Sequence, residues 1–199
     1  MGRLAKFIYF YGEEETDLPK QYKRVKGFVV DNNGFWEIKG LKLSGSDTVR
    51  FSFSATNRCN VFGCYTTNAA GDNYSLYVST SSNAKYLRYN GGTFASYFSP
   101  ANLDKRFDVV ITPTGTKGMP LDSTWEEKNF TSSVDMCIGT SSTSATSASL
   151  KGKLYGEFIV DGRFKGIPCE RVSDGAIGYY DTYSKTFFEE TGSGAVVIR

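Results

Sequence analysis

The chain has 199 residues, a length that suits one β-sandwich or β-barrel domain with a core that needs no disulfide or metal. Its net charge of +2, with both signs mixed along the sequence, excludes the concentrated basic face of a nucleic-acid-binding protein. No apolar run approaches the roughly 20 residues that span a bilayer, so membrane insertion is not expected. The 15% aromatic content and the 21 glycines favour an all-β fold.

The first 17 residues are predicted to form an arm outside the main domain. Residues 5–11 are apolar and typical of a strand, and an acidic run follows at residues 13–17. The apolar segment is shorter than the core of a secretory signal, so we expect a protein made in a host cytoplasm without a signal peptide. A lone strand is a candidate for pairing elsewhere, here on a neighbouring subunit.

Short segments with strand periodicity follow, separated by turn residues. Residues 46–55 alternate and place Val49, Phe51 and Phe53 on one face. An Asn-Gly-Gly turn beginning at Asn90 predicts a hairpin, because Asn and Gly tolerate positive φ. Further strands are predicted at residues 74–78, 85–89, 93–98, 134–139 and 150–160, with a buried strand at residues 106–112. One helical turn is predicted near residues 99–105, and the Ser/Thr-rich residues 139–149 are expected to form a solvated loop.

The four cysteines are Cys59, Cys64, Cys137 and Cys169. Their spacing matches no metal-binding pattern. Because free cysteine packs as a small hydrophobe, buried free thiols are the favoured interpretation, and a disulfide framework is the alternative.

Two blocks carry a resemblance to a known family. The opening block is LPKQYKRV at residues 18–25, followed by a glycine-turn hairpin ending at residues 35–38. The closing block extends from Gly152 to Gly194; its defining residues are Pro168, Cys169, Gly175, Gly178, Tyr180, Asp181, Phe187, Gly192 and Gly194. In this order the blocks resemble the concanavalin A-like (laminin-G-like) jelly-roll domains of phage structural proteins and gut-bacterial surface proteins. The resemblance implies a two-sheet antiparallel jelly-roll sandwich over residues 18–199.

The closing block also has a structural interpretation. Gly175 and Gly178 are expected to allow turns, and Asp181 to hydrogen-bond to the backbone of the turn that follows it. Phe187 or Phe188 is expected to fill the core, and Cys169 to be a packed thiol. These residues are therefore predicted to close the sandwich and not to form an active site.

The sequence offers little for catalysis. It contains no histidine, which excludes His-dependent nucleophilic catalysis and His-ligated zinc. Some relatives of the resembled fold cleave glucans with paired carboxylates, but adjacent Glu126 and Glu127 would point to opposite faces of a strand. Glu157 and Asp161 could share a face, although Asp161 is more simply a hairpin turn. We expect a protein that is not an enzyme.

The residue types suggest two kinds of binding site. Laminin-G-like domains often hold calcium, and Asp72, Asn73 and Asp135 are the candidate ligands. An Asp-Asn pair is common in turns, so no cofactor is expected. A glycan site is predicted on the aromatic hairpin, where flat rings would stand beside an amide; its residues are Tyr86, Tyr89, Asn90, Phe94 and Tyr97. The alternative is that these rings cover the core.

The resemblance, the arm and the lack of catalytic motifs together favour a non-enzymatic phage virion component, a capsid decoration or tail-associated module. Its expected partners are other virion subunits, including further copies of itself. The alternative function is a lectin-like, carbohydrate-binding adhesin that recognises cell-surface glycans. In either case specificity is expected in the divergent middle, residues 55–148, because loops carry function while the sandwich holds them.

Overall fold

The computed structural model describes residues 18–31, 33–65, 73–78, 87–89, 92–94, 102–119, 123–143 and 149–199. Of Leu87, Arg88 and residues 92–94 it describes the backbone. The arm at residues 1–17 lies outside the described residues, as do Asp72, Tyr86, Asn90 and Tyr97. All named elements of the described part are β-strands, and every strand pairing among them is antiparallel. The all-β prediction is confirmed.

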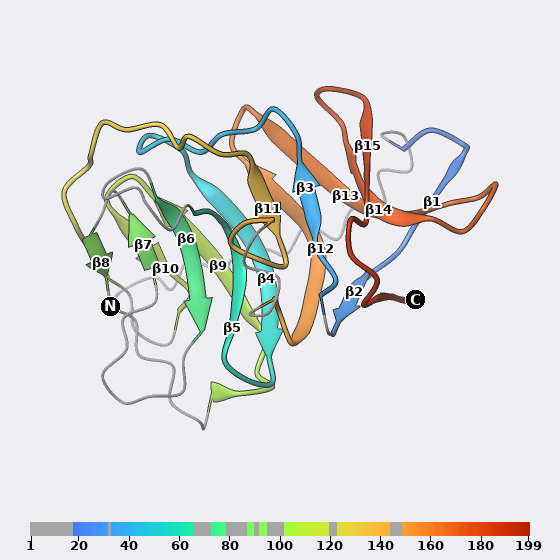
Figure 1. Cartoon of the computed structure of the whole chain (residues 1–199), viewed down its shortest axis with the longest axis horizontal. Helices are drawn as coiled ribbons and strands as arrows, with labels where there is room; N and C mark the ends of the chain where they lie inside the picture. Colours follow the sequence, from blue (N-terminus) through green and yellow to red (C-terminus); the bar gives the residue numbers. More distant parts are fainter. Residues whose placement is uncertain are drawn as a thin grey trace, which may run out of the picture.

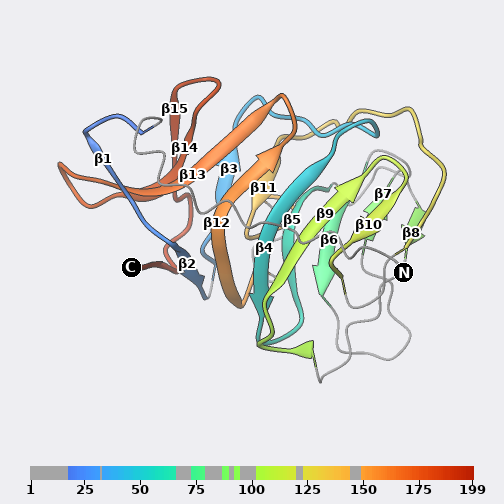
Figure 2. The same ribbon diagram turned by 180° about the vertical axis from the view of Figure 1, so that it is seen from behind.

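Ten of the described strands form the larger sheet, which faces the viewer in Figure 2. Its main path runs β10-β9-β4-β12-β13-β14-β15, and β1, β2 and β16 join it at the side. The strands are β1 (Tyr22–Arg24), β2 (Gly27–Val30), β4 (Val49–Ala55), β9 (Phe107–Thr112), β10 (Gly115–Lys117), β12 (Gly152–Val160), β13 (Phe164–Arg171), β14 (Ile177–Asp181), β15 (Thr186–Glu189) and β16 (Ala195–Ile198).

Six described strands form the smaller sheet, in the order β3-β11-β5-β6-β7-β8, in front in Figure 1. They are β3 (Trp36–Ile38), β5 (Cys59–Cys64), β6 (Tyr74–Val78), β7 (Leu87–Tyr89), β8 (Gly92–Phe94) and β11 (Met136–Ile138). The two sheets enclose one hydrophobic core to which both contribute. The architecture is that of an antiparallel β-sandwich.

The core is dense in aromatic rings that bridge the two sheets. Phe62 of β5 packs edge-to-face against Phe51 of β4 and Phe158 of β12, with ring centroids 5.1 and 5.5 Å apart. Toward the other end, Trp36 of β3 contacts Phe28 of β2 and Tyr179 of β14, with ring centroids 4.6 and 5.3 Å apart. Such contacts add to the stabilisation from buried area, and they explain why the sequence is rich in phenylalanine and tyrosine.

Strand β12 is the branch point of the larger sheet, because two different strands, β2 and β13, pair with successive halves of one of its edges. Its first half, Gly152 to Tyr155, pairs with β2, and its second half, Phe158 to Val160, pairs with β13. The register against β4 shifts between Tyr155 and Ile159. Gly156 lies at this irregularity with a φ of 62°. The sheet therefore forks at β12 into a β2–β16 branch and a β13–β15 branch.

Several predicted segments need correction. Residues 35–38 do not close a hairpin with β2, because β2 belongs to the larger sheet and β3 to the smaller one. The turn between them carries the chain across the core, so that Phe28 and Trp36 meet from opposite sides. The strand at residues 106–112 is buried on one face only, through Val109 and Ile111.

The Ser/Thr-rich stretch at residues 139–149 is not simply solvated. Its described members Thr140, Ser141, Ser142 and Ser149 are buried. The Ser141 carbonyl accepts a hydrogen bond from the Tyr65 amide at 2.9 Å. Composition predicted solvent because hydroxyl side chains are usually exposed, but a backbone contact holds this end of the stretch against β5. The predicted helical turn at residues 99–105 is described only from Asn102, where the chain forms a turn.

Candidate functional site

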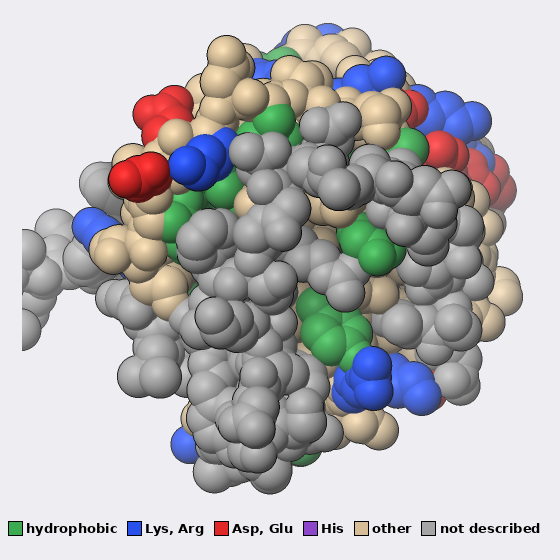
Figure 3. All heavy atoms as spheres, turned by 60° about the vertical axis from the view of Figure 1, so that its left-hand side comes forward, with side chains coloured by type: hydrophobic (Ala, Val, Ile, Leu, Met, Phe, Trp, Pro, Cys, Tyr) green, Lys and Arg blue, Asp and Glu red, His purple; other side chains and the backbone are tan. Residues whose placement is uncertain are grey.

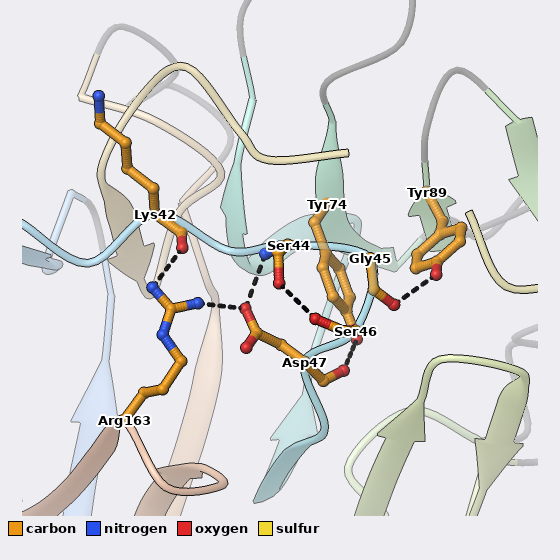
Figure 4. A network of polar contacts seen from close by, with 8 residues as sticks. All are labelled: Lys42, Ser44, Gly45, Ser46, Asp47, Tyr74, Tyr89 and Arg163. Carbon is orange, nitrogen blue, oxygen red and sulfur yellow. Dashed lines mark hydrogen bonds and ion pairs between the residues drawn. The ribbon is translucent and has the colours of Figure 1, made fainter. Parts of the chain in front are cut away.

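The loop between β3 and β4 is held by an unusual number of polar contacts (Figure 4). The Asp47 side chain is 6% exposed. Its Oδ2 atom accepts hydrogen bonds from the Ser44 amide at 2.7 Å and from Arg163 Nη1 at 2.6 Å. Arg163 lies in the β12–β13 turn, and its Nη2 donates to the Lys42 carbonyl at 2.8 Å. One guanidinium therefore fixes two points of the loop to the larger sheet.

Two tyrosines fix the same loop to the smaller sheet (Figure 4). The Tyr89 hydroxyl on β7 donates to the Gly45 carbonyl at 2.6 Å and accepts from the Lys128 amide at 3.3 Å. The Tyr74 hydroxyl on β6 donates to the Asp47 carbonyl at 3.4 Å. Burial raises the pKa of both tyrosines above its ordinary value, because a phenolate would be poorly solvated there. Both hydroxyls therefore remain neutral donors.

Gly45 occupies a position that no larger residue fits. A Cβ atom there would lie 1.7 Å from the Lys128 carbonyl oxygen. The close approach allows the Gly45 amide to donate to the Phe130 carbonyl at 3.0 Å, and Ser132 to donate to the Leu43 carbonyl at 2.7 Å. Residues 128–132 therefore run along the β3–β4 loop as a second, backbone-bonded segment.

An open polar cleft of about 490 Å³ lies where these two segments meet. It is lined by Ser44, Ser46, Glu127, Lys128, Asn129, Phe130 and Thr131. Hydroxyl, amide and charged groups surround one aromatic ring, a combination suited to hydrogen-bonding a polar ligand. We call this the loop cleft. Hydrogen bonds behind the cleft hold both of its segments in place, and we take it as a candidate site.

Of the predicted aromatic glycan site, Tyr89 is the one side chain that the structure describes. The hairpin itself forms, with β7 and β8 paired. Tyr89, however, is 0% exposed and packs edge-to-face against Tyr74 and Phe130. Tyr89 is therefore a core residue and does not contact a glycan at the surface. The Phe94 side chain, Tyr86, Asn90 and Tyr97 lie outside the described residues.

The candidate calcium ligands do not form a cluster among the described residues. Asp135 accepts a hydrogen bond from the Gly40 amide at 3.0 Å, and Asn73 is 7% exposed at the start of β6. Within residues 18–199, leaving out the undescribed segments, no group of three or more His, Cys, Asp or Glu side chains could hold a metal ion. No helix in that part of the chain has the length and apolar character of a membrane span.

Glu157 and Asp161, the carboxylates that could share a strand face in a glycosidase, each form an ion pair with an arginine. Glu157 contacts Arg24 at 2.8 Å, and Asp161 contacts Arg50 at 2.8 Å. Asp161 begins the turn between β12 and β13, as predicted. These contacts stabilise strand pairings at the outer face of the larger sheet.

Residues of the closing block form turns and packing contacts in strands β13 to β15. Asp181 is 3% exposed, and its carboxylate accepts hydrogen bonds from the amides of Lys165, Tyr183 and Ser184 at 2.9–3.2 Å. The prediction for Asp181 is confirmed. Gly175 lies in a turn with a φ of 75°, as predicted. Gly178 does not form a turn: it lies within β14, where a Cβ would meet the Phe188 carbonyl oxygen at 2.2 Å.

The remaining members of the closing block fill defined places. Pro168 and Cys169 lie in β13, and Tyr180 is buried in β14. Phe188 packs against the core, whereas Phe187 lies on the other face and stacks on Tyr22 with ring centroids 5.0 Å apart. The last two glycines are Gly192, which faces the Asn33 carbonyl, and Gly194, whose carbonyl accepts from the Asp31 amide at 2.8 Å.

All four cysteines are free and buried, as predicted. Burial raises the pKa of Cys59 to about 11 and of Cys64, Cys137 and Cys169 to about 12. In the unfolded chain a thiol ionises near pH 8.5. Folding therefore favours the protonated thiol, and its contribution to stability is complete below about pH 8.5 and is lost as pH rises toward 11–12.

A thiol-labelling experiment checks this. At pH 8 the native protein is expected to react with a disulfide reagent about a hundredfold or more slowly than the urea-unfolded chain, because little thiolate is present and access is blocked. The urea midpoint is expected to fall between pH 8 and pH 11. Rapid native labelling of any one thiol would contradict its burial.

Toward the upper edges of the face shown in Figure 3, described Lys and Arg side chains lie beside Asp and Glu side chains. Comparisons with family models, with curated proteins and with solved structures found no match to this chain.

Proposed function

We propose that this protein is a non-enzymatic virion component, a concanavalin A-like jelly-roll module that acts through contacts with neighbouring subunits. The observation that supports this most is an exposed apolar pair at one edge of the larger sheet, on edge strand β16 and its neighbour β2. Four large hydrophobic side chains are exposed among the described residues, and two of them, Val29 and Val196, are cross-strand neighbours on β2 and β16. An apolar edge strand readily pairs with another chain.

The sandwich is suited to a structural role. The β3–β4 loop is hydrogen-bonded to both sheets, and the Asp181 turn is fixed by three backbone amides. Such a module presents its surfaces in fixed positions, so partners can bind without ordering it first. The proposed localisation is the virion, with other virion subunits and further copies of this chain as partners.

Sedimentation velocity of the purified full chain over a wide concentration range tests the proposal. We expect a discrete oligomer, and deletion of residues 1–17 is expected to leave a folded monomer with unchanged circular dichroism. A full-length protein that stays monomeric at every concentration would count against an assembly role through the arm. Equal oligomers with and without residues 1–17 would leave assembly standing and reject the arm.

The second candidate function is glycan binding, and the loop cleft favours it. Sugars are bound largely by hydrogen-bond donors and acceptors, and the exposed side chains of Glu127 and Asn129 provide these at the cleft, whose lining also includes the largely buried Phe130. Binding to a panel of immobilised bacterial and host glycans tests it. We expect Asn129→Ala to weaken any binding at least tenfold, whereas Lys185→Ala, in the distant β14–β15 turn, should not. Binding that survives Asn129→Ala and Glu127→Ala would place the glycan elsewhere.

A further inference from the structure

Strand β16 forms an edge of the β2–β16 branch, beside the C-terminus in Figure 1. Among the described strands it pairs only with β2. Its side chains alternate: Ala195 and Val197 pack against the core, and Val196 points outward with 65% of its surface exposed. Val29, opposite Val196 on β2, is 38% exposed. We call Val29, Val196 and the free side of β16 the valine edge.

The backbone at the valine edge is arranged to accept another strand. In an antiparallel ladder, alternate residues direct their N–H and C=O groups toward the partner strand. The Asp31 amide donates to the Gly194 carbonyl, so the Gly194 carbonyl and, two residues later, both backbone groups of Val196 are directed toward β2, while the Gly194 amide donates to Glu190 Oε1. Ala195 and Val197 therefore direct theirs away from it; the Ala195 amide bonds to Glu190 Oε1. Val197 offers a donor and an acceptor to an added strand.

Charge differs between the two ends of the valine edge. Exposed Asp31 lies at the start of β16, beside Gly194. Lys26 and Arg199 lie at the end of β16, and both are exposed, although Arg199 also forms an ion pair with Glu170 at 3.1 Å. The edge therefore changes from acidic to basic along the direction of β16.

The N-terminal arm has a complementary pattern. Arg3 and Lys6 lie at its start, an apolar strand-length segment follows, and three glutamates and Asp17 complete it. A parallel alignment with β16 brings the basic start beside Asp31 and the acidic end beside Lys26 and Arg199. An antiparallel alignment would place like charges together, which is unfavourable.

We propose that residues 4–11 of a second copy of this chain add to β16 as a parallel strand, with their side chains beside Val196. This inference rests on the assembly role proposed above and names the surface that carries it. An added strand removes part of the Val196 surface from water and gains backbone hydrogen bonds, the mode of recognition known as β-strand addition.

Sedimentation velocity of full-length variants tests the site. Val196→Asp is expected to weaken self-association about tenfold or more, since it places a charge in the covered surface. Val172→Asp is the matched control, because Val172 is equally exposed, at 65%, but lies after β13 at the far branch. The circular dichroism spectra of both variants are expected to match that of the wild type, because neither side chain is buried within its own chain.

Complementation separates this proposal from a general loss of assembly. Ile8→Asp disables the arm and leaves the valine edge intact, whereas Val196→Asp does the reverse. Each variant alone should be a monomer, and a mixture should recover a heterodimer through one intact arm and one intact edge. Mixed oxidation of Glu13→Cys with Arg199→Cys should cross-link the copies, and Arg3→Cys with Arg199→Cys should not.

The outcomes distinguish failure of the valine-edge proposal from failure of the proposed assembly role. If the wild type forms an oligomer that Val196→Asp leaves unchanged, the valine edge is rejected and the assembly role stands. A wild type that is monomeric at every concentration rejects both. If the mixture stays monomeric although each single variant has lost its oligomer, arm and edge do not bind each other. Cross-linking of the Arg3→Cys pair alone would reject the parallel direction.

Discussion

Replacing Phe62 with alanine is expected to lower the free energy of unfolding by about 4 kcal/mol. The Phe62 side chain is fully buried on the smaller sheet and contacts Phe51 and Phe158 of the larger one. Its removal takes away apolar contact area and leaves a cavity between the sheets that rigid neighbours cannot close. Urea unfolding followed by tryptophan fluorescence and circular dichroism measures the change.

Two control variants show whether the loss of stability comes from the cavity. Phe62→Leu keeps most of the volume and is expected to cost about 1 kcal/mol. Tyr183→Ala, at a position 54% exposed, should change the free energy of unfolding by less than about 0.5 kcal/mol. A loss below about 1 kcal/mol for Phe62→Ala would mean that the two sheets are not packed as described.

Replacing Arg163 with alanine should lower the free energy of unfolding by about 2 kcal/mol, because Asp47 is buried whereas the Arg163 side chain is 38% exposed and water replaces part of the lost contact. The change leaves the Asp47 carboxylate, 6% exposed, without its cation, and it frees the Lys42 carbonyl from its donor. A buried charge without a partner is costly, since the interior solvates it poorly. The β3–β4 loop, and with it the loop cleft, should become more open to proteolysis.

Arg50→Ala is the matched control. Arg50 also binds an aspartate, Asp161, through two nitrogens, but both side chains are nearly half exposed at 47% and 43%. Water replaces the lost partner there, so a loss of less than about 1 kcal/mol is expected. Equal losses for the two variants would show that the burial of Asp47 has no energetic consequence. Both are measured by urea unfolding at pH 7.

Strand positions and buried faces were readable from the sequence because they depend on local alternation. Val49, Phe51 and Phe53 recur every second residue, and all three are buried on β4. The Asp181 turn was readable because an aspartate before a turn bonds to amides a few residues away. Where a strand or turn depends on residues close together in the sequence, the sequence pattern predicts the structure correctly.

The loop cleft could not be predicted, because its contacts join distant segments. Nothing near Ser44 or Asp47 indicates that Arg163 will reach them, since that depends on how β12 pairs with β4. Tyr89 illustrates the same limit: alternation shows that residues of a hairpin have two faces, but not which face is covered. Tyr74 and Phe130, which bury Tyr89, lie elsewhere in the sequence.

The pairing of β16 with β2 also has a consequence for synthesis of the protein on the ribosome. Residues 27–30 emerge early, but the strand that covers this side of them, residues 195–198, emerges only after most of the chain has been translated. At about 5–20 residues per second, β2 waits many seconds with an apolar edge exposed. β12, which pairs with the other side of β2, is also late. Nascent chains are therefore expected to need protection by chaperones that bind exposed strands, and stalled or truncated products to aggregate rather than to remain partly folded.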